Sequence, residues 1–393
     1  MTVLIVLSVV SFAWWGAQAL LFLRARWSVH QVGTVDPTMP PGGWPKLSLV
    51  MPARNEAAHL EAALNSKFAS TYPNLELVLV DDRSTDDTGA IADRLAALDS
   101  RLHVVHLTEL PAGWLGKVHA MAKGLEACTG EFVLFSDADI VIAPGTFERV
   151  IAEAQRRALD FITIFPRVRL TGLALRLSLA TMFRVMLLFT RPWAVRDRRS
   201  SAFMGVGAFN LVRRSAFAKT RGLEWLRMET GDDVALGRMM KVSGAACEVF
   251  LGGDAVHLEF YPSYGVMMRA VEKNGASAPA TALFAACGGL VLLEMGFVAG
   301  WALGGGWAVG ATLVAVLGPV LTFFVGRWLG FPTSASPLAA LGVLPFGFVM
   351  VRSAVLALVR GGVIWRDTFY PTKTVAEGRR MFGSPSRAPV SKQ

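Results

Sequence analysis

The sequence predicts an α/β protein with a doubly wound, mostly parallel sheet, joined to membrane-spanning helices. Three observations support this class. Short apolar runs alternate with helical patterns in the middle of the chain, polar clusters follow the ends of these runs, and long apolar segments lie near both termini. Of the 393 residues, 53% are hydrophobic and only 18% are charged. Charged residues make up about a quarter of an ordinary soluble chain, so the composition excludes that class.

The alternating segment extends over residues 46–278 and is long enough for one sizeable core. The predicted strands are Leu47–Met51, Leu75–Val80, Leu102–Leu107 and Phe132–Ser136. The helices predicted between them are Glu56–Lys67, Asp86–Leu98 and Lys117–Ala127. Strands that alternate with helices favour a parallel sheet, which binds ligands at the carboxyl ends of its strands. We therefore expect a catalytic domain over residues 46–278 with its site at that edge.

An uncharged apolar run, Val3–Leu23, is long enough to cross the hydrocarbon core of a membrane. Arg24 and Arg26 follow it, and the positive-inside rule then places the next residues in the cytoplasm. Ala17–Ala19 resembles a signal-peptide cleavage site, but no basic residue precedes the run, as one would in a signal peptide. We expect an uncleaved anchor over residues 1–26, then a Pro/Gly-rich linker over 27–45.

Three apolar segments, Ala280–Leu303, Trp307–Val325 and Pro337–Val359, predict a transmembrane bundle over residues 279–359. A basic tail follows over residues 360–393. If all three segments cross, a cytoplasmic catalytic domain puts this tail outside, against the positive-inside tendency. We therefore expect two or three C-terminal crossings. If only two segments cross, the third is re-entrant.

The net charge of +9 comes from arginines beside apolar segments, as expected near anionic lipid and not for a nucleic-acid partner. Within 170–195, the spacing of Arg176, Arg184 and Arg191 places all three on one helical face. The segment is either a helix in the membrane interface or a core helix with one solvated face. The three cysteines are far apart and form no Cys-x-x-Cys pair, which fits a reducing compartment.

Two carboxylates, Asp137 and Asp139, follow the last predicted strand as Asp-Ala-Asp. Oxygen ligands of this kind suit Mg²⁺ or Mn²⁺, which often bridge protein carboxylates to substrate phosphates. An Asp-x-Asp is also common in loops, but its position after a buried strand favours a metal site.

Three more clusters lie at predicted strand ends or helix starts. Pro52, Asn55 and Glu56 follow the first strand, where a small polar turn lets a nucleotide approach the backbone. Asp82 ends the second strand and can accept a hydrogen bond from a base or ribose, whereas the acids after it suit turns and helix caps. Lys117, at a helix start after two glycines, can neutralise phosphate or be a surface lysine.

Two clusters lie later in the chain. Asp232 and Asp233 open a predicted helix, where they can cap it, or one can act as a general base for an attacking alcohol. Arg269 and Lys273 precede the second apolar block, where they can hold a departing diphosphate or face lipid.

The ordered set of motifs resembles the lipid-directed and processive-like members of glycosyltransferase family two. The set is Pro-x-x-Asn-Glu, Val-Asp-Asp-x-Ser-x-Asp-x-Thr, Gly-Trp-x-Gly-Lys, Asp-Ala-Asp and Gly-Asp-Asp. Together with Lys273-Asn274 and Gly361–Arg366, it is most similar to the bacterial branch of hopanoid and carotenoid glycosylation, related to ceramide glucosyltransferases. The resemblance implies a GT-A fold, a nucleotide-diphosphate sugar donor of the UDP-sugar type, and inversion at the anomeric carbon.

By motif, the resemblance implies that Asp82 contacts uridine, Asp137 approaches the donor and Asp139 ligates the metal. It also implies that Lys117 contacts the diphosphate and that Asp233 is the general base. The usual Glu-Asp of the base motif is Asp232-Asp233 here. The Gln-x-x-Arg-Trp motif of processive enzymes is absent, which argues against polymer synthesis.

These residues predict an enzyme that transfers sugar to a membrane lipid at the cytoplasmic face of a bacterial inner membrane, with Mn²⁺ or Mg²⁺. Two alternatives remain open. A membrane-anchored nucleotidyltransferase also uses Asp-x-Asp but does not need a second acid at a late helix start. A non-catalytic membrane protein that binds nucleotide sugars would not need all four of the acids Asp82, Asp137, Asp139 and Asp233.

Overall fold

The computed structural model describes residues 1–366 and 368–380, and the chain divides into two compact units. The apolar unit comprises Met1–Ser28, Val168–Arg191 and Glu259–Ala376. The sheet unit comprises Val29–Arg167, Pro192–Leu258 and, among the last described residues, Glu377–Arg380. This division differs from the predicted domain boundaries, because residues 168–191 and 259–278 pack with the apolar helices.

The sheet unit contains an eight-stranded sheet in the order β1-β10-β7-β9-β5-β2-β3-β4. Its strands are β1 (His30–Gln31), β2 (Leu47–Ala53), β3 (Leu75–Asp82), β4 (Leu102–Leu107), β5 (Phe132–Phe135), β7 (Phe161–Phe165), β9 (Asn210–Arg213) and β10 (Cys247–Leu251). All neighbours pair parallel except β9, which is antiparallel to both β5 and β7. The predicted mostly parallel sheet is confirmed.

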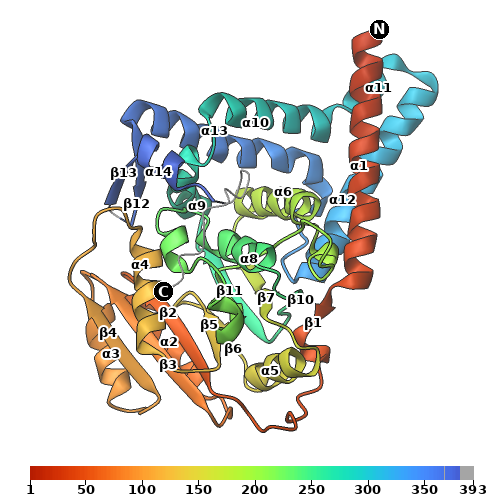
Figure 1. Cartoon of the computed structure of the whole chain (residues 1–393). Coiled ribbons are helices and arrows are strands. Elements are labelled where there is room, and N and C mark those ends of the chain that lie inside the picture. The colour runs from red at the N-terminus through yellow and green to blue at the C-terminus, as the bar shows by residue number, and fades with distance from the viewer. Residues whose placement is uncertain (367, 381–393) are drawn as a thin grey trace. The chain divides into compact units, whose positions relative to one another are not determined.

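Helices connect these strands, as Figure 1 shows. They are α2 (Ala57–Phe68), α3 (Thr88–Ala96), α4 (Gly116–Ala127), α5 (Thr146–Arg156), α7 (Arg214–Phe217) and α8 (Asp232–Val242). A smaller sheet has the order β6-β11-β8, with β6 at Val141–Ile142, β11 at Val256–Tyr261 and β8 at Arg167–Leu170. Every residue of β2 and β3 is buried, which is the mark of a sheet covered on both faces.

The predicted linker is wrong at its start. His30–Gln31 forms β1, which pairs in parallel with Phe250–Leu251 of β10 at the edge of the sheet. Two residues are too few to show a period-2 pattern, so the sequence gives no strand signal there.

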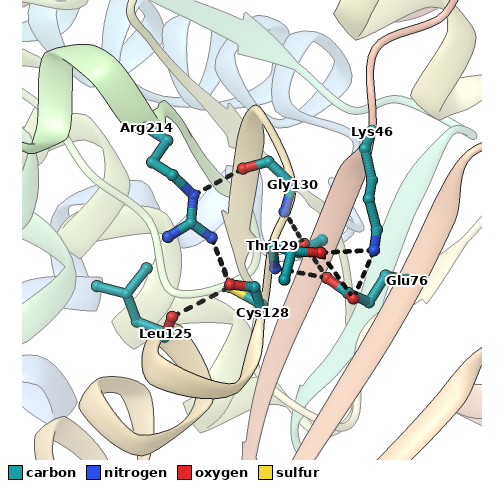
Figure 2. A network of polar contacts seen from close by, with 8 residues as sticks. Lys46, Glu76, Leu125, Cys128, Thr129, Gly130 and Arg214 are labelled. Atoms are coloured by element: carbon teal, nitrogen blue, oxygen red, sulfur yellow. Dashed lines mark hydrogen bonds and ion pairs between the residues drawn. The ribbon is translucent and has the colours of Figure 1, made fainter.

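A polar network ties the loop after α4 to the amino-terminal ends of β2 and β3 (Figure 2). Lys46 Nζ lies 2.8 Å from Glu76 Oε1, and the backbone N–H of Thr129 donates to Glu76 Oε2 at 2.9 Å. The Ser48 hydroxyl also donates to Glu76. Burial alone would raise the pKa of Glu76, but these hydrogen bonds and the charge of Lys46 lower it to about 2. The ionised carboxylate therefore stabilises the folded unit.

Arg214 closes the other side of the same loop. Its Nε donates to the carbonyl of Gly130 at 2.7 Å, and its Nη2 donates to the carbonyl of Cys128 at 2.8 Å (Figure 2). The network lies at the sheet edge opposite the strand ends that carry the predicted site, so its contribution is to stability.

Glu76→Gln is expected to lower the free energy of unfolding at pH 6 and to lose this effect in acid. A carboxyl with an ordinary pKa of 4.5 and a folded value of about 2 contributes about 3 kcal/mol above pH 4.5, lost as the pH falls towards 2. Thermal unfolding of the purified protein at pH 6 and pH 3 measures this. Glu126→Gln, at a surface glutamate whose side chain is 64% exposed, is the control. A constant gap between Glu76→Gln and wild type across this range contradicts the prediction.

The apolar unit is built from helices and one hairpin. They are α1 (Thr2–Ser28), α6 (Leu173–Thr190), α9 (Tyr264–Ala270), α10 (Ala280–Met295), α11 (Val298–Leu303), α12 (Gly305–Leu329), α13 (Val343–Arg360), the hairpin β12 (Gly362–Trp365) and β13 (Thr368–Pro371), and α14 (Thr372–Gly378). α11 and α12 lie along α1, while α10 and α6 both pack on α13 (Figure 1).

Four helical stretches in the described residues are long and apolar enough to cross a membrane. They are Thr2–Ser28, Leu173–Ala194, Gly305–Leu329 and Ser336–Arg360. The predicted N-terminal anchor and two of the predicted C-terminal segments are therefore confirmed at the level of length and composition. The stretch Leu173–Ala194 lies in the segment that was predicted as an interfacial or core helix.

The predicted crossing Ala280–Leu303 is wrong as a single helix. It breaks between α10, of 16 residues, and α11, of 6 residues. About 20 residues are needed to cross a hydrocarbon core of roughly 30 Å, so neither part crosses alone. At the break, a Cβ on Gly296 would lie 3.0 Å from the carbonyl oxygen of Leu7, so glycine permits α1 to approach there.

The predicted row of three arginines on α6 is also corrected. Arg184 is buried, and its Nη2 lies 2.9 Å from Glu294 Oε2 of α10. Gln18 and Trp14 of α1 donate to the other carboxylate oxygen. A buried charge is tolerated when it is paired and hydrogen-bonded, so this face of α6 is packed, not solvated. Arg191 follows the end of the helix, in a left-handed conformation with φ 46°.

Candidate functional site

The carboxyl ends of β2, β3 and β5 lie at one edge of the sheet because these strands pair in parallel. A pocket at this edge brings together parts of four predicted clusters. It is lined by Pro52, Lys117, Met121, Phe135, Ser136, Asp137, Gly207, Asn210, Asp232 and Asp233. Pro52 comes from β2, Lys117 from α4, Asp137 from the loop after β5, and the two later acids from α8.

Lys117 lies at the centre of this constellation. Its Nζ is 2.7 Å from Asp137 Oδ1 and 3.2 Å from Asp232 Oδ2, and its side chain is only 12% exposed. Burial alone would lower the pKa of Lys117, but the charges of Asp137, Asp232 and Asp233 raise it above its usual range. A permanently charged ammonium beside a pocket suits an anionic ligand.

The two acids of α8 have different surroundings. Asp232 is buried and paired with Lys117. Asp233 is half-buried, and its Oδ2 accepts a hydrogen bond from the backbone N–H of Gly207 at 2.9 Å. Its Oδ1 accepts from the backbone N–H of Val234 at 2.8 Å. These two bonds hold the Asp233 carboxylate beside the pocket that it lines.

The loop after β5 places Asp137 and Asp139 near one another. Burial and the charge of Asp137 raise the pKa of Asp139. A cation between two such carboxylates would relieve both effects, so the residues fit a divalent metal. Among the described residues no group of three or more His, Cys, Asp or Glu side chains could hold a metal alone. The remaining ligands would therefore come from water or from the phosphates of a substrate.

Sequence reasoning missed the segment between α6 and β9 that closes the pocket. Gly207 donates its N–H to Asp233, and its carbonyl accepts from the backbone N–H of Asp137 at 2.9 Å. A Cβ on Gly205 would lie 1.9 Å from the carbonyl oxygen of Asp233. The only signal in the sequence is the pair of glycines two residues apart, which is weak without knowledge of what they pack against.

Gly207→Ala is expected to weaken binding of a phosphate-containing ligand by one to two orders of magnitude. The new Cβ would lie 2.6 Å from Asp137 Oδ2 and 3.4 Å from Lys117 Nζ, so this ion pair must move. Hydrogen bonds to charged groups contribute roughly 1.5–3 kcal/mol, which sets the size of the effect. Titration calorimetry with UDP measures it. In Gly33→Ala the added methyl meets nothing within 4 Å, so that variant is the control, and equal affinities would contradict the prediction.

Other predicted site residues do not line this pocket. Asp82 is fully buried and paired with Arg83, with 2.8 Å between Oδ1 and Nε. The side-chain oxygen of Asn55 accepts from the backbone N–H of Thr85 at 2.8 Å. The backbone N–H of Glu56 donates to the Thr88 hydroxyl at 2.8 Å. These bonds tie the loop after β2 to the loop after β3.

The turn and cap interpretation of Asp86 is confirmed. Its carboxylate accepts from the backbone N–H groups of Thr88 at 3.0 Å and Ala57 at 3.2 Å. These bonds join the starts of α2 and α3.

Arg269 and Lys273 both belong to the apolar unit. Arg269 is exposed at the end of α9, and Lys273 Nζ lies 4.4 Å from the ring centroid of Trp365. Between them, Glu272 pairs with Arg352 at 2.7 Å and with Arg360 at 2.8 Å. Their role towards a diphosphate stays a prediction.

Residues 48–221 match the protein family described as Glycosyl transferase family 2. Among curated proteins, the chain is 30% identical over 118 residues to the uncharacterized glycosyltransferase EpsJ of Bacillus subtilis, covering 30% of this chain and 33% of that one. It is 31% identical over 110 residues to GalNAc(5)-diNAcBac-PP-undecaprenol beta-1,3-glucosyltransferase of Campylobacter jejuni, covering 28% and 35%. The chain thus spans about a third of the length of these relatives.

Among solved structures, the chain resembles the mannosyltransferase PcManGT from Pyrobaculum calidifontis, solved in complex with GDP-Man and Mn2+. The TM-score is 0.50 at 18% identity, over 90% of this chain and 99% of that one. At this identity the likeness shows the fold, and it agrees with the mostly parallel sheet described above. The chain therefore has a GT-A-like fold, and its residues 48–221 are similar to the proteins of Glycosyl transferase family 2.

Proposed function

We propose that this protein transfers a sugar from a UDP-sugar to the hydroxyl of a membrane lipid, with inversion at the anomeric carbon, at the cytoplasmic face of a bacterial inner membrane. The observation that carries the proposal is Lys117, charged and nearly buried between Asp137 and Asp232 in a pocket that Asp233 also lines. A cation, a candidate metal ligand and a candidate base meet there, as sugar transfer from a nucleoside diphosphate requires.

In this proposal Lys117 binds the donor diphosphate, and Asp232 holds the ammonium in place. Asp233 accepts the proton of the attacking hydroxyl, because general-base catalysis needs an acceptor within hydrogen-bond reach of the acid. Its carboxylate is fixed by two backbone N–H groups, and the residue lines the pocket.

Asp137 and Asp139 would hold Mn²⁺ or Mg²⁺. When bound, the metal would neutralise charge on the diphosphate as the sugar departs. Asp137 also contacts Lys117, so the same carboxylate would align the ammonium and the metal on one anionic group.

The remaining donor contacts are assigned by motif. Asp82 would contact the uridine. The loop after β2, with Pro52, Asn55 and Glu56, would form the side of the donor site next to it. Arg269 and Lys273 would complete the diphosphate site. Asp82 is buried against Arg83, so a contact with uridine requires the arginine side chain to move or to contact the uracil as well.

The lipid acceptor is supported by the apolar unit and by one relative. Four helical stretches have the length and composition of membrane spans. The Campylobacter jejuni relative is named as a beta-1,3-glucosyltransferase of GalNAc(5)-diNAcBac-PP-undecaprenol. The motifs of the sequence favour a hopanoid-type lipid, and the absence of the processive motif favours a single transfer.

Two measurements test this function. Titration calorimetry with UDP-sugars, with and without Mn²⁺, is expected to show metal-dependent binding, and no binding of any nucleotide sugar would reject the proposal. Incubation with donor and membrane lipid, followed by mass spectrometry, is expected to give glycolipid and free UDP. Release of pyrophosphate would indicate nucleotidyl transfer instead.

The cytoplasmic orientation has its own test. A cysteine introduced at the exposed Ser100 is expected to react with a membrane-impermeant maleimide only after permeabilisation. Cys128 and Cys247 are buried, and Cys287 should be replaced first because it is partly exposed. Labelling of Ser100→Cys in intact cells would overturn the orientation.

A further inference from the structure

The last described residues of the chain, Glu377–Arg380, fold onto the segment that precedes the candidate base. We call these four residues the strap; they belong to the sheet unit. The backbone N–H of Arg380 donates to Glu229 Oε2. The guanidinium of Arg238, on α8, donates to the carbonyl of Arg380. The strap is therefore bound through its main chain, from both sides.

Side-chain contacts reinforce this attachment. Arg380 Nε donates to the carbonyl of Trp225 at 3.2 Å, and its guanidinium carbon lies 5.9 Å from the centroid of the indole ring. A Cβ on Gly378 would lie 2.4 Å from Met228 Cβ and 2.5 Å from the Met228 carbonyl oxygen. Only a glycine permits this approach, so the strap packs in one register.

The segment held by the strap leads directly into the helix whose first two residues line the pocket. Glu229 is buried, and its second carboxylate oxygen accepts from the backbone N–H of Gly231 at 3.0 Å. Gly231 is the residue before α8, which begins with Asp232 and Asp233. One buried carboxylate thus joins the strap to the start of the helix that carries both acids.

The same segment touches the lysine loop. The carbonyl of Arg227 accepts from the backbone N–H of Leu115 at 2.7 Å, two residues before Lys117. A shift of the segment 225–231 would therefore move Lys117 and Asp232 relative to Asp137. Displacements of about 1 Å can cost roughly a hundredfold in rate.

We propose that the strap positions the pocket, with Glu229, Arg238 and Arg380 as positioning residues that touch no substrate. The rate readout of this inference rests on the proposed sugar transfer. The strap begins in the last turn of α14, so in this proposal the site is complete only when this C-terminal segment is in place.

A matched pair of truncations tests the proposal. A chain ending at Ala376 lacks the strap, and a chain ending at Gly383 keeps it. We expect the first to lose at least tenfold in kcat and the second to match the full chain. A peptide of residues 372–388, added in trans, should restore part of the lost rate, which a general loss of folding would not allow. Wild-type kcat in the chain ending at Ala376 would overturn the proposal.

Arg238→Met supplies a substitution that keeps the strap. It removes the bond to the Arg380 carbonyl but leaves an apolar side chain near Phe203, whose ring centroid lies 6.0 Å from the guanidinium. Its effect on kcat should vanish in the chain ending at Ala376, because both changes remove the same interaction. Additive losses would contradict a shared mechanism.

Hydrogen exchange separates the strap from the proposed function. In the chain ending at Ala376, amides of residues 223–236 should exchange at least tenfold faster, while those of β2, β3 and β5 keep wild-type rates. If the full chain transfers no sugar from any donor, the proposed function fails. The exchange result alone then tests whether the strap positions the segment 223–236. Unchanged exchange in residues 223–236 would refute it.

Discussion

Asp233→Asn is expected to reduce sugar transfer by about two orders of magnitude or more while leaving donor binding in place. The amide has nearly the shape of the carboxylate but cannot accept a proton from an attacking hydroxyl. Its single oxygen can keep the bond from either Gly207 or Val234, so one backbone hydrogen bond is lost. Such a bond contributes about 1 kcal/mol to stability, which shifts the melting temperature only slightly.

The matched variant is Asp232→Asn. Asp232 is buried against Lys117, so its neutralisation should weaken donor binding and stability more than Asp233→Asn does. Single-turnover rates, calorimetry with UDP and thermal unfolding of both variants separate the two roles. If Asp233→Asn transfers sugar at nearly the wild-type rate, the base is Asp232 or a residue outside this motif.

The sheet and the pocket edge could be predicted because their signals are local. β2, β3 and β5 are short apolar runs, each followed by polar residues, and their observed ends fall within two residues of the predicted ones. The acids that follow such runs come together once the strands pair in parallel. The proximity of Lys117, Asp137 and Asp232 therefore follows from the sheet topology, which the sequence pattern predicts.

The rest depends on packing between distant segments. β9 has four residues and inserts antiparallel between β5 and β7, a position that no local pattern specifies. Gly205 and Gly207 matter only because α8 and Asp137 approach them closely. The burial of Arg184 requires Glu294, which is 110 residues away in the chain, so its spacing on α6 alone suggested a solvated face.

The strap illustrates the same limit. Arg379 and Arg380 belong to a segment whose composition predicts only a basic tail. Its main-chain bonds to Glu229 and Arg238 carry no residue preference, apart from the glycine at 378. The attachment of the strap depends on backbone groups, so the basic composition of this segment could not predict it.

Asp139→Ala is expected to abolish Mn²⁺-dependent binding of UDP while leaving the fold intact. Asp139 and Asp137 repel one another in the absence of a cation, so removal of one carboxylate should not destabilise the metal-free protein. The loop has further anchors, because the buried amine of Lys67 donates to the carbonyl of Ile140 and to that of Ala63.

Calorimetry with UDP across a Mn²⁺ series measures this effect, and circular dichroism verifies the fold. Asp160→Ala removes a carboxylate from the same unit without touching the pocket, so it is the control. A divalent ion held by two carboxylates and substrate phosphates loses half of its protein ligands when Asp139 is removed. Metal-independent residual affinity should remain, because Lys117 still faces the phosphates. A folded Asp139→Ala protein whose UDP affinity rises with Mn²⁺ as in wild type would show that Asp139 is not a ligand and would leave Asp137 as the single protein contact to the metal.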